Sequence, residues 1–173
     1  VLVPSRSLQE LTRALSDDAE VTLVLAEQMV SFSVGDFHLS TRLIKGDFPD
    51  YQKLIPTDMP NCLTVERQAL ADAIRRVRLM ARENSPIRLT MKAEGLELRA
   101  ITQEIGEAVE ELDAKYEGSE LTVAFNPEYL VDGLEVTPGE QVSLETVDSL
   151  KPALIRPIGS EDFLYLLMPV WVS

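Results

Sequence analysis

The feature that most constrains the fold of this 173-residue chain is an internal repeat. One order of elements, a strand, a helix and three further strands, can be followed three times, starting near residues 1, 62 and 121. Leu8, Leu70 and Leu130 occupy matching places in the three predicted helices. A single unit of this kind buries little apolar surface, so we expect the units to pack in pairs. Three copies leave one unit without its pair.

The first copy combines one helix with a β-hairpin. Ser7 and Glu10 have the spacing of a capping box, which predicts the start of the helix. Leu8, Leu11 and Leu15 recur at helical spacing and predict a buried stripe. Strands are predicted over 21–25, 29–34 and 37–45, with the tight turn of the hairpin at residues 35–36.

The second and third copies repeat this order. The second has a predicted helix over 68–81, and Asn126 with Pro127 predicts the start of the helix in the third. The predicted strands are 62–65, 87–93, 96–100 and 107–116 in the second copy and 121–125, 141–146, 153–155 and 163–170 in the third.

The connections between the copies predict a domain boundary. Only residues 118–120 join the second copy to the third, whereas a looser stretch with Pro49, Pro56 and Pro60 joins the first to the second. We therefore expect residues 1–57 to be half of a truncated domain and residues 58–173 to be a complete one. The chain opens at Val1 directly in a predicted strand, which suggests a piece of something longer or a processed product.

Composition excludes several classes of site. The single cysteine excludes an internal disulfide framework or Cys-rich zinc site, and the single histidine excludes a multi-histidine metal site, so no metal or other cofactor is expected. The 29 acidic residues against 16 basic ones give a charge of −13, which opposes nonspecific coating of nucleic acid. The longest apolar stretch, residues 163–172, is too short for a bilayer, and no signal peptide is visible, so we expect a cytoplasmic protein.

Nothing in the sequence predicts catalysis. Most acidic residues fall in runs typical of a solvated surface, and His38 and Cys62 lie within predicted strands. The glycines are isolated in turns and form no phosphate-binding loop. A carboxylate-based hydrolase remains a remote alternative.

Arginines gather on two of the predicted helices. Arg6 and Arg13 share a face of the first, and Arg67, Arg75, Arg78 and Arg82 lie on or beside the second. Two interpretations stay open on this pattern alone. The arginines are either ordinary solvated residues or contacts to phosphate groups without base readout.

The C-terminal stretch, residues 163–172, is almost wholly apolar. It predicts a buried last strand, but Pro169 cannot donate to a strand ladder and is typical of a sheet edge. Apolar residues that include methionine and tryptophan at an edge also suit a groove for a peptide.

Four motifs carry a resemblance to a known family. They are Val34-Gly35-Asp36-Phe37, Gly46-Asp47-Phe48-Pro49-Asp50-Tyr51 with Ile55-Pro56, Phe125-Asn126-Pro127-Glu128-Tyr129-Leu130, and Tyr165-Leu166-Leu167-Met168-Pro169-Val170. On these motifs the chain resembles, over essentially its whole length, the C-terminal half of the bacterial DNA polymerase III beta subunit, the sliding clamp.

The resemblance implies an α+β fold, the DNA clamp fold, built from repeated βαβββ units with antiparallel sheets outside and helices inside. It implies that residues 1–57 are the second half of the middle clamp domain and residues 58–173 the complete C-terminal domain. Two full-length subunits would close into a homodimeric ring around duplex DNA without reading its sequence. The expected function is that of a non-catalytic replication processivity factor. Its peptide-binding groove would recruit the replicative polymerase, the clamp loader and repair proteins.

The resemblance also implies three sets of site residues. The peptide-binding groove would comprise Pro49, Lys53, Leu54, Asn126, Tyr129, Leu150, Pro152, Leu166, Leu167, Met168, Pro169, Val170 and Trp171. The DNA-facing residues would be Arg6, Arg13, Arg75, Arg78 and Arg82. The dimer edge would comprise Leu79, Glu104, Glu107, Glu110 and Glu111.

One departure concerns the groove rim. The family usually has an arginine where this chain has Trp171, so a bulky ring replaces a long cation. A free-standing peptide-binding adaptor without a DNA role is the alternative function. A concave surface lined by Arg6, Arg75 and Arg78 would favour the clamp over this adaptor.

Overall fold

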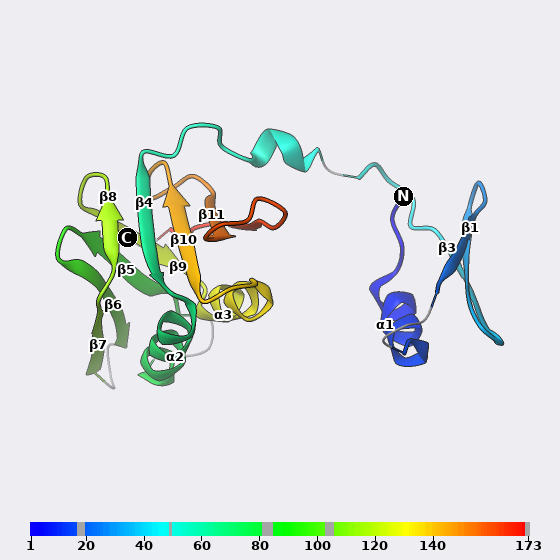
Figure 1. Ribbon diagram of the computed structural model, residues 1–173, viewed down its shortest axis with the longest axis horizontal. Coiled ribbons are helices and arrows are strands. Elements are labelled where there is room, and N and C mark those ends of the chain that lie inside the picture. The colour runs from blue at the N-terminus through cyan, green and yellow to red at the C-terminus, as the bar shows by residue number, and fades with distance from the viewer. Residues whose placement is uncertain (17–19, 49, 81–84, 103–105, 172–173) are drawn as a thin grey trace. The chain divides into compact units, whose positions relative to one another are not determined.

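The computed structural model describes residues 1–16, 20–48, 50–80, 85–102 and 106–171. They form two compact units, Val1–Asp50 and Tyr51–Ser173. The elements are helices and antiparallel sheets (Figure 1), which confirms the predicted mixed class. Among the described helices none is long and apolar enough to cross a membrane.

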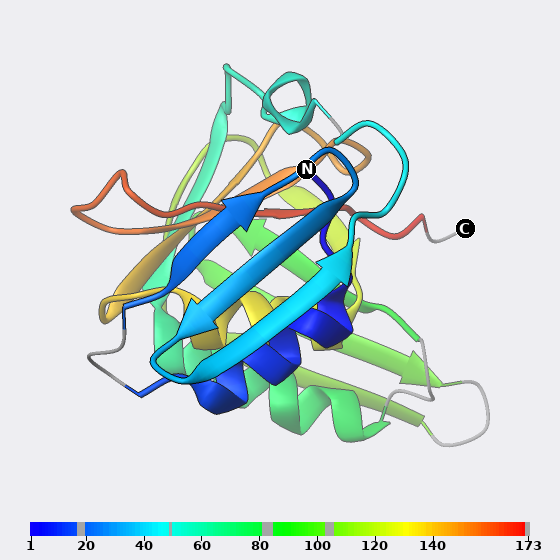
Figure 2. The same ribbon diagram turned by 90° about the vertical axis from the view of Figure 1, so that its right-hand side faces the viewer.

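The first unit is one helix against a three-stranded sheet (Figure 2). Its elements are α1 (Ser5–Ala14), β1 (Thr22–Leu25), β2 (Met29–Val34) and β3 (Phe37–Arg42). The strands pair antiparallel in the order β1-β2-β3. Leu11 of the helix packs with Val30 and Phe32 to form a small core. Leu2 adds a single bridge to Ile44, where the repeat predicts a first strand.

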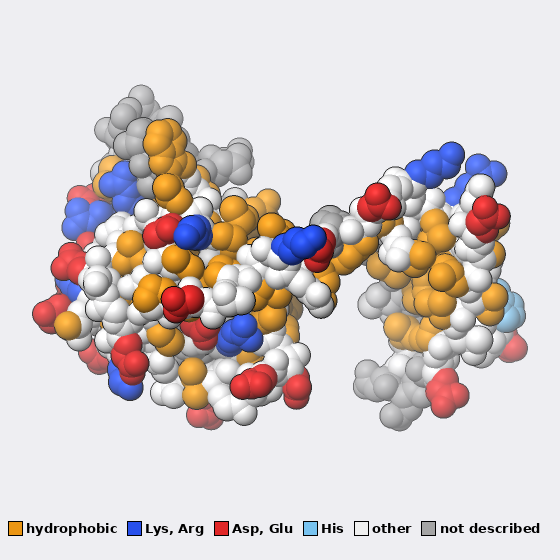
Figure 3. All heavy atoms as spheres, turned by 90° about the horizontal axis from the view of Figure 1, so that it is seen from above, with side chains coloured by type: hydrophobic (Ala, Val, Ile, Leu, Met, Phe, Trp, Pro, Cys, Tyr) orange, Lys and Arg blue, Asp and Glu red, His pale blue; other side chains and the backbone are white. Residues whose placement is uncertain are grey.

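Two predictions about α1 are wrong. The Ser7 hydroxyl donates to the Thr41 hydroxyl, 3.0 Å away, instead of capping the helix, which Pro4 precedes without any side-chain cap. Of the predicted leucine stripe only Leu11 is buried, whereas Leu8 is 42% and Leu15 39% exposed. The small sheet of this unit covers only part of the helix, and hydrophobic side chains remain visible on the surface of this unit (Figure 3).

The second unit has two sheets and two helices that lie side by side, α2 and α3 (Figure 1). Its strands follow the orders β12-β11-β10-β4-β8 and β7-β6-β5-β9. One continuous core, which includes Leu63, Ile74, Phe125 and Leu134, joins the sheets to the helices. The elements are η1 (Tyr51–Leu54), β4 (Asn61–Glu66), α2 (Arg67–Val77), η2 (Arg78–Met80), β5 (Ile87–Lys92), β6 (Gly95–Thr102), β7 (Gly106–Leu112), β8 (Lys115–Glu117), β9 (Leu121–Phe125), α3 (Pro127–Val136), β10 (Gln141–Thr146), β11 (Ala153–Pro157) and β12 (Tyr165–Leu167).

The helix starts differ in how well the sequence predicts them. The Asn126 side chain caps α3 by accepting from the Glu128 amide at 2.9 Å, as predicted. Helix α2 begins at Arg67, one residue earlier than predicted, because the Glu66 carboxylate accepts from the amides of Gln68 and Ala69. It ends at Val77, and a 3-10 turn follows where the prediction continued the helix.

The strand predicted over residues 107–116 is in fact two strands. Strand β7 pairs with β6. After the break at Asp113 and Ala114 the chain crosses to the other sheet, where β8 pairs with β4. Gly95, with a φ of +139°, allows this crossing, because a Cβ there would lie 2.6 Å from the Leu112 carbonyl oxygen. The last strand, β12, is also shorter than the predicted 163–170.

Candidate functional site

The apolar C-terminal segment forms one side of the candidate site. Strand β12 pairs with β11, and after Leu167, which is buried, Met168 is 55% exposed. The Val170 amide then donates to the Ala124 carbonyl of β9 at 2.8 Å. These bonds fix the backbone on both sides of Met168 and hold its apolar side chain toward solvent.

Helix α3 supports this segment from beneath. The ring of Tyr165 lies so close to Gly133 that a Cβ there would come within 2.6 Å of two ring carbons. Partial burial raises the pKa of Tyr165, and the Tyr129 hydroxyl adds a smaller contribution in the same direction. Tyr129 itself is 56% exposed. The first turn of α3 thus presents a tyrosine close to β12.

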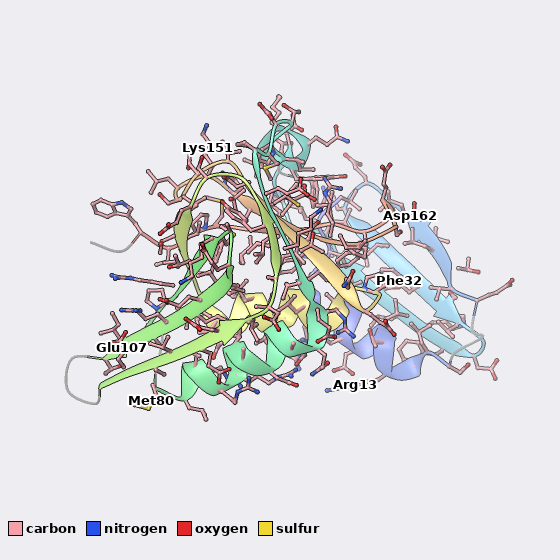
Figure 4. The ribbon with its side chains drawn as sticks, turned by 60° about the vertical axis from the view of Figure 1, so that its left-hand side comes forward. Arg13, Phe32, Met80, Glu107, Lys151 and Asp162 are labelled. Atoms are coloured by element: carbon pink, nitrogen blue, oxygen red, sulfur yellow. The ribbon has the colours of Figure 1, made fainter. Side chains whose placement is uncertain are left out.

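The loop after β10 carries a second exposed apolar residue. The Asp148 carboxylate accepts from the amides of Leu150 and Lys151, at 2.8 and 2.9 Å, and these bonds lower its pKa. The turn leaves Leu150 61% exposed and Pro152 partly buried. Lys151 labels this loop in Figure 4.

A buried amide fixes the start of that loop. The Asn61 amide nitrogen donates to the carbonyls of Thr146 and Val147, at 3.3 and 3.0 Å. Its oxygen accepts from the Tyr116 hydroxyl at 3.0 Å and from the Ser119 amide at 3.2 Å. One side chain therefore joins three segments of the chain.

Three of the predicted groove residues line one cavity. Leu150, Val170 and Trp171 surround a volume of about 290 Å³ together with Arg88, Thr122, Ala124 and Ser149. Tyr129 and Tyr165 lie near each other on the α3 side. Lys53 and Leu54 lie on the exposed turn η1, and Pro49 lies outside the described residues.

The predicted DNA-facing arginines differ in their partners. Arg75 bridges Asp72 of its own helix, at 2.6 Å, and Glu135 of α3, at 2.7 Å, and these hydrogen bonds raise its pKa. Arg78 is exposed on η2, and no carboxylate is paired with it in the described part of the chain.

The remaining predicted arginines belong elsewhere. Arg6 and Arg13 are exposed on α1 in the first unit, where Arg13 pairs with Glu10 at 2.8 Å. Arg82 lies outside the described residues. The shared concave surface of Arg6, Arg75 and Arg78 stays a prediction, since it spans both units.

The predicted dimer edge lies along β7 and η2. Both carboxylate oxygens of Glu110 accept from Arg76, at 2.5 and 2.6 Å, and the hydrogen bonds lower the pKa of Glu110. Glu107 pairs with Arg99 at 2.9 Å, and Leu79 is 80% exposed. Glu107 and Met80, which follows Leu79, are labelled at the same end of the unit in Figure 4.

Two further predictions concern that edge. Glu111 is exposed on β7, and Glu104 lies outside the described residues. In the described ranges no group of three or more His, Cys, Asp or Glu side chains could hold a metal ion.

Sequence reasoning missed two residues that shape the site. Asn61 precedes a predicted strand and carries no signal of its buried role. Arg67 donates to the carbonyls of Gly139, at 2.8 Å, and Leu134, at 3.1 Å, so it holds the end of α3 instead of facing solvent. Both contacts join residues far apart in the sequence, which helical or strand periodicity does not reveal.

Comparison with known proteins assigns both units. The family description "DNA polymerase III beta subunit, C-terminal domain" matches residues 52–171, and its "central domain" matches residues 1–50. The beta sliding clamp of Streptomyces coelicolor is 36% identical over 183 residues, which cover 99% of this chain and 49% of that protein. That of Bacillus subtilis is 35% identical over 175 residues, covering 98% and 46%.

Solved structures agree with these relatives. The crystal structure of the Bacillus subtilis DNA polymerase sliding clamp has a TM-score of 0.92 at 34% identity, covering 99% of this chain and 46% of that one. A Bartonella birtlesii sliding clamp bound to griselimycin has a TM-score of 0.94 at 32% identity, covering 99% and 47%.

The chain spans about half the length of the relatives it matches. Within that half, both family descriptions follow one another in chain order, and the fold agrees with solved clamps throughout. The chain therefore belongs to the family of the DNA polymerase III beta subunit, the bacterial beta sliding clamp.

Proposed function

We propose that this chain is the C-terminal half of a clamp that encircles duplex DNA and recruits replication proteins through an apolar groove on its second unit. The observation that carries the proposal is a set of exposed apolar side chains held in place by backbone bonds. Tyr129, Leu150, Met168 and Trp171 are 56, 61, 55 and 78% exposed. Such residues on a well-packed body are typical of a site for a partner.

The groove suits a short peptide better than a second folded surface. Its side chains come from the start of α3, the loop after β10 and the segment after β12, and the loop and the C-terminal segment line a cavity of about 290 Å³. Apolar anchors of a peptide would fill the space beside Met168, while the Asn126 amide group and the Tyr129 hydroxyl would bond to its backbone. The replicative polymerase, the clamp loader and repair proteins are the proposed partners.

The DNA-facing role rests on the helices. Arg78 carries a charge that no described carboxylate neutralises, whereas Arg75 on α2 bridges Asp72 and Glu135. A closed ring would hold DNA by topology, so a few phosphate contacts suffice and the net charge of −13 is no obstacle. We propose a non-catalytic role in the cytoplasm, with ring closure by a homodimer of full-length subunits.

We also propose that residues 1–57 are the second half of the middle domain and residues 58–173 the complete C-terminal domain. Strand β4, the first strand of the second unit, begins at Asn61, shortly after this boundary. The 173-residue chain alone should then fail to form the native closed dimer, because the matching edge belongs to the missing half. A stable two-fold ring of this chain in light scattering would contradict the division.

Titration calorimetry tests the groove. The 173-residue chain should bind griselimycin, the compound bound to the Bartonella birtlesii clamp, and a peptide of the clamp-binding segment of the polymerase from the same bacterium. Met168→Ala should weaken peptide binding by about 1–3 kcal/mol, the range for a central anchor. Met29→Ala is the matched control, because Met29 is similarly exposed, at 42%, on the first unit. Equal affinity for wild type and Met168→Ala would remove Met168 from the groove.

NMR titration with a short duplex tests the DNA-facing surface. Amide shifts should concentrate on the C-terminal end of α2 and on η2, and they should fade as salt rises. Arg78→Gln should reduce them. Shifts confined to the β7 edge would contradict the assignment and favour an adaptor without a DNA role.

A further inference from the structure

The cavity beside the groove combines an apolar wall with an isolated cation. It encloses about 290 Å³, and Leu150, Val170 and Trp171 form its apolar side. Its polar side comes from Arg88, Ser149 and the edge of β9. Arg88, Thr122, Ala124 and Ser149 are outside the predicted groove, so the cavity extends that groove along the sheet.

Arg88 differs from its neighbour across the strands. Its register partner Arg99 pairs with Glu97 at 3.1 Å and with Glu107 at 2.9 Å. Arg88 is partly buried on β5, and no described carboxylate pairs with it. A partly desolvated guanidinium without a counter-ion gains from a bound anion, because a charge-assisted hydrogen bond then replaces incomplete hydration.

The contrast extends over most of the second unit. Its other described cations with carboxylate partners are Arg75, Arg76, Lys92, Lys115, Lys151 and Arg156. In an acidic protein such pairing is easily achieved, which makes the isolation of Arg88 informative. The Ser149 hydroxyl, which lines the same cavity, has no hydrogen bond within the described ranges either.

The strand edge can guide an extended ligand into the cavity. The Ala124 carbonyl accepts from the Val170 amide, so Ala124 directs its peptide groups away from β5 and toward the outer edge of β9. Because alternate residues of a strand direct their peptide groups the same way, those of Thr122 face that edge as well. An added segment could bond there as strands do in β-augmentation.

We propose that this cavity is a subsite for a carboxylate, the side chain of an Asp or Glu in an extended partner segment whose apolar anchor occupies the groove. The proposal rests on the proposed function of that groove. Arg88 would bind the carboxylate, Ser149 would donate to it, and Trp171 would cover the adjoining methylene groups of the segment. Because the protein as a whole is acidic, it would repel an acidic residue elsewhere in the segment. The subsite would therefore select segments whose acidic residue lies at the position that reaches Arg88.

Paired peptides test the subsite by titration calorimetry on the 173-residue chain. The polymerase clamp-binding peptide is extended by Asp-Asp or by Asn-Asn, at each end in turn. At one end the Asp-Asp form should bind about tenfold more tightly than the Asn-Asn form, and the preference should shrink with added salt. Arg88→Gln should abolish the preference and leave the affinity of the Asn-Asn peptide unchanged, while Arg88→Lys should keep part of it.

Arg99→Gln is the matched control. It removes the same charge from the neighbouring strand, but Arg99 already has two carboxylate partners, so the preference should persist. If the Asp-Asp peptide binds no more tightly than the Asn-Asn peptide at either end, or if its preference survives Arg88→Gln, the subsite is wrong. The proposed groove would not be affected by this result. Failure of every peptide to bind would overturn both the subsite and the groove.

Discussion

Because Gly133 contacts Tyr165, we expect Gly133→Ala to destabilise the protein when Tyr165 is present and to stabilise it when Tyr165 is replaced by alanine. In an exposed helix interior, Gly→Ala stabilises by about 1 kcal/mol. Here the new methyl would lie 2.6 Å from both Cδ1 and Cε1 of Tyr165 and 3.0 Å from Cγ. These atoms belong to the aromatic ring, and the backbone that carries it is held in β12.

The ring or the helix must therefore move. Overpacking of this kind costs about 1–3 kcal/mol. After subtraction of the helix-propensity gain, Gly133→Ala should lower the free energy of unfolding by up to about 2 kcal/mol. Urea denaturation followed by circular dichroism measures this change, since α2 and α3 both lie in the affected unit.

A double-substitution cycle separates the two contributions. In a Tyr165→Ala background the space beside Gly133 is empty, so Gly133→Ala should stabilise by about 1 kcal/mol. The effect of Gly133→Ala on the free energy of unfolding should therefore reverse its sign between the two backgrounds. Equal stabilisation by Gly133→Ala in both backgrounds would refute the reasoning, because it would mean that the ring imposes no constraint.

Three further perturbations probe the same unit. Asn61→Ala should lower the free energy of unfolding by about 2–3 kcal/mol in urea denaturation, because it leaves buried carbonyls and an amide without partners. An unchanged free energy of unfolding would contradict the structural role of the Asn61 side chain. Glu66→Ala should cost about 1 kcal/mol through the lost cap of α2, seen as a lower urea midpoint. The Arg76 hydrogen bonds lower the pKa of Glu110, so their contribution is present above the unfolded-state pKa and is lost as pH falls through the lower folded-state value. The stability difference between wild type and Arg76→Gln should therefore shrink on acidification from pH 7, and a difference that grows would contradict this.

Local signals predicted much of the fold. The sequence pattern predicted β2, β9 and β10 with their observed ends, and the Asn126-Pro127 pair predicted the start of α3. The errors occur where a distant contact overrides the local pattern. The Ser7 hydroxyl donates to Thr41 of β3 instead of capping its helix. The strand predicted over 107–116 divides between two sheets, because its first part pairs with β6 and its second part with β4.

Most residues of the candidate site were predictable only through the family resemblance. Apolar side chains in the C-terminal segment suggested a groove, and the structure shows Met168 and Trp171 exposed there. The isolation of Arg88 from carboxylates depends on the pairing of β5 with β6 and β9. No pattern along the chain distinguishes it from Arg99.

The position of β4 has a consequence for how the second unit folds during synthesis. Although it is the first strand of its sheet to leave the ribosome, β4 occupies an interior place between β8 and β10. Its pairing with Gln141–Thr146 must wait until almost the whole unit has emerged, and β12 adds to the sheet last of all. The segment that carries Met168 is therefore the last part of the sheet to fold. A nascent chain stalled before this segment would expose the sheet edge at β11 to chaperones.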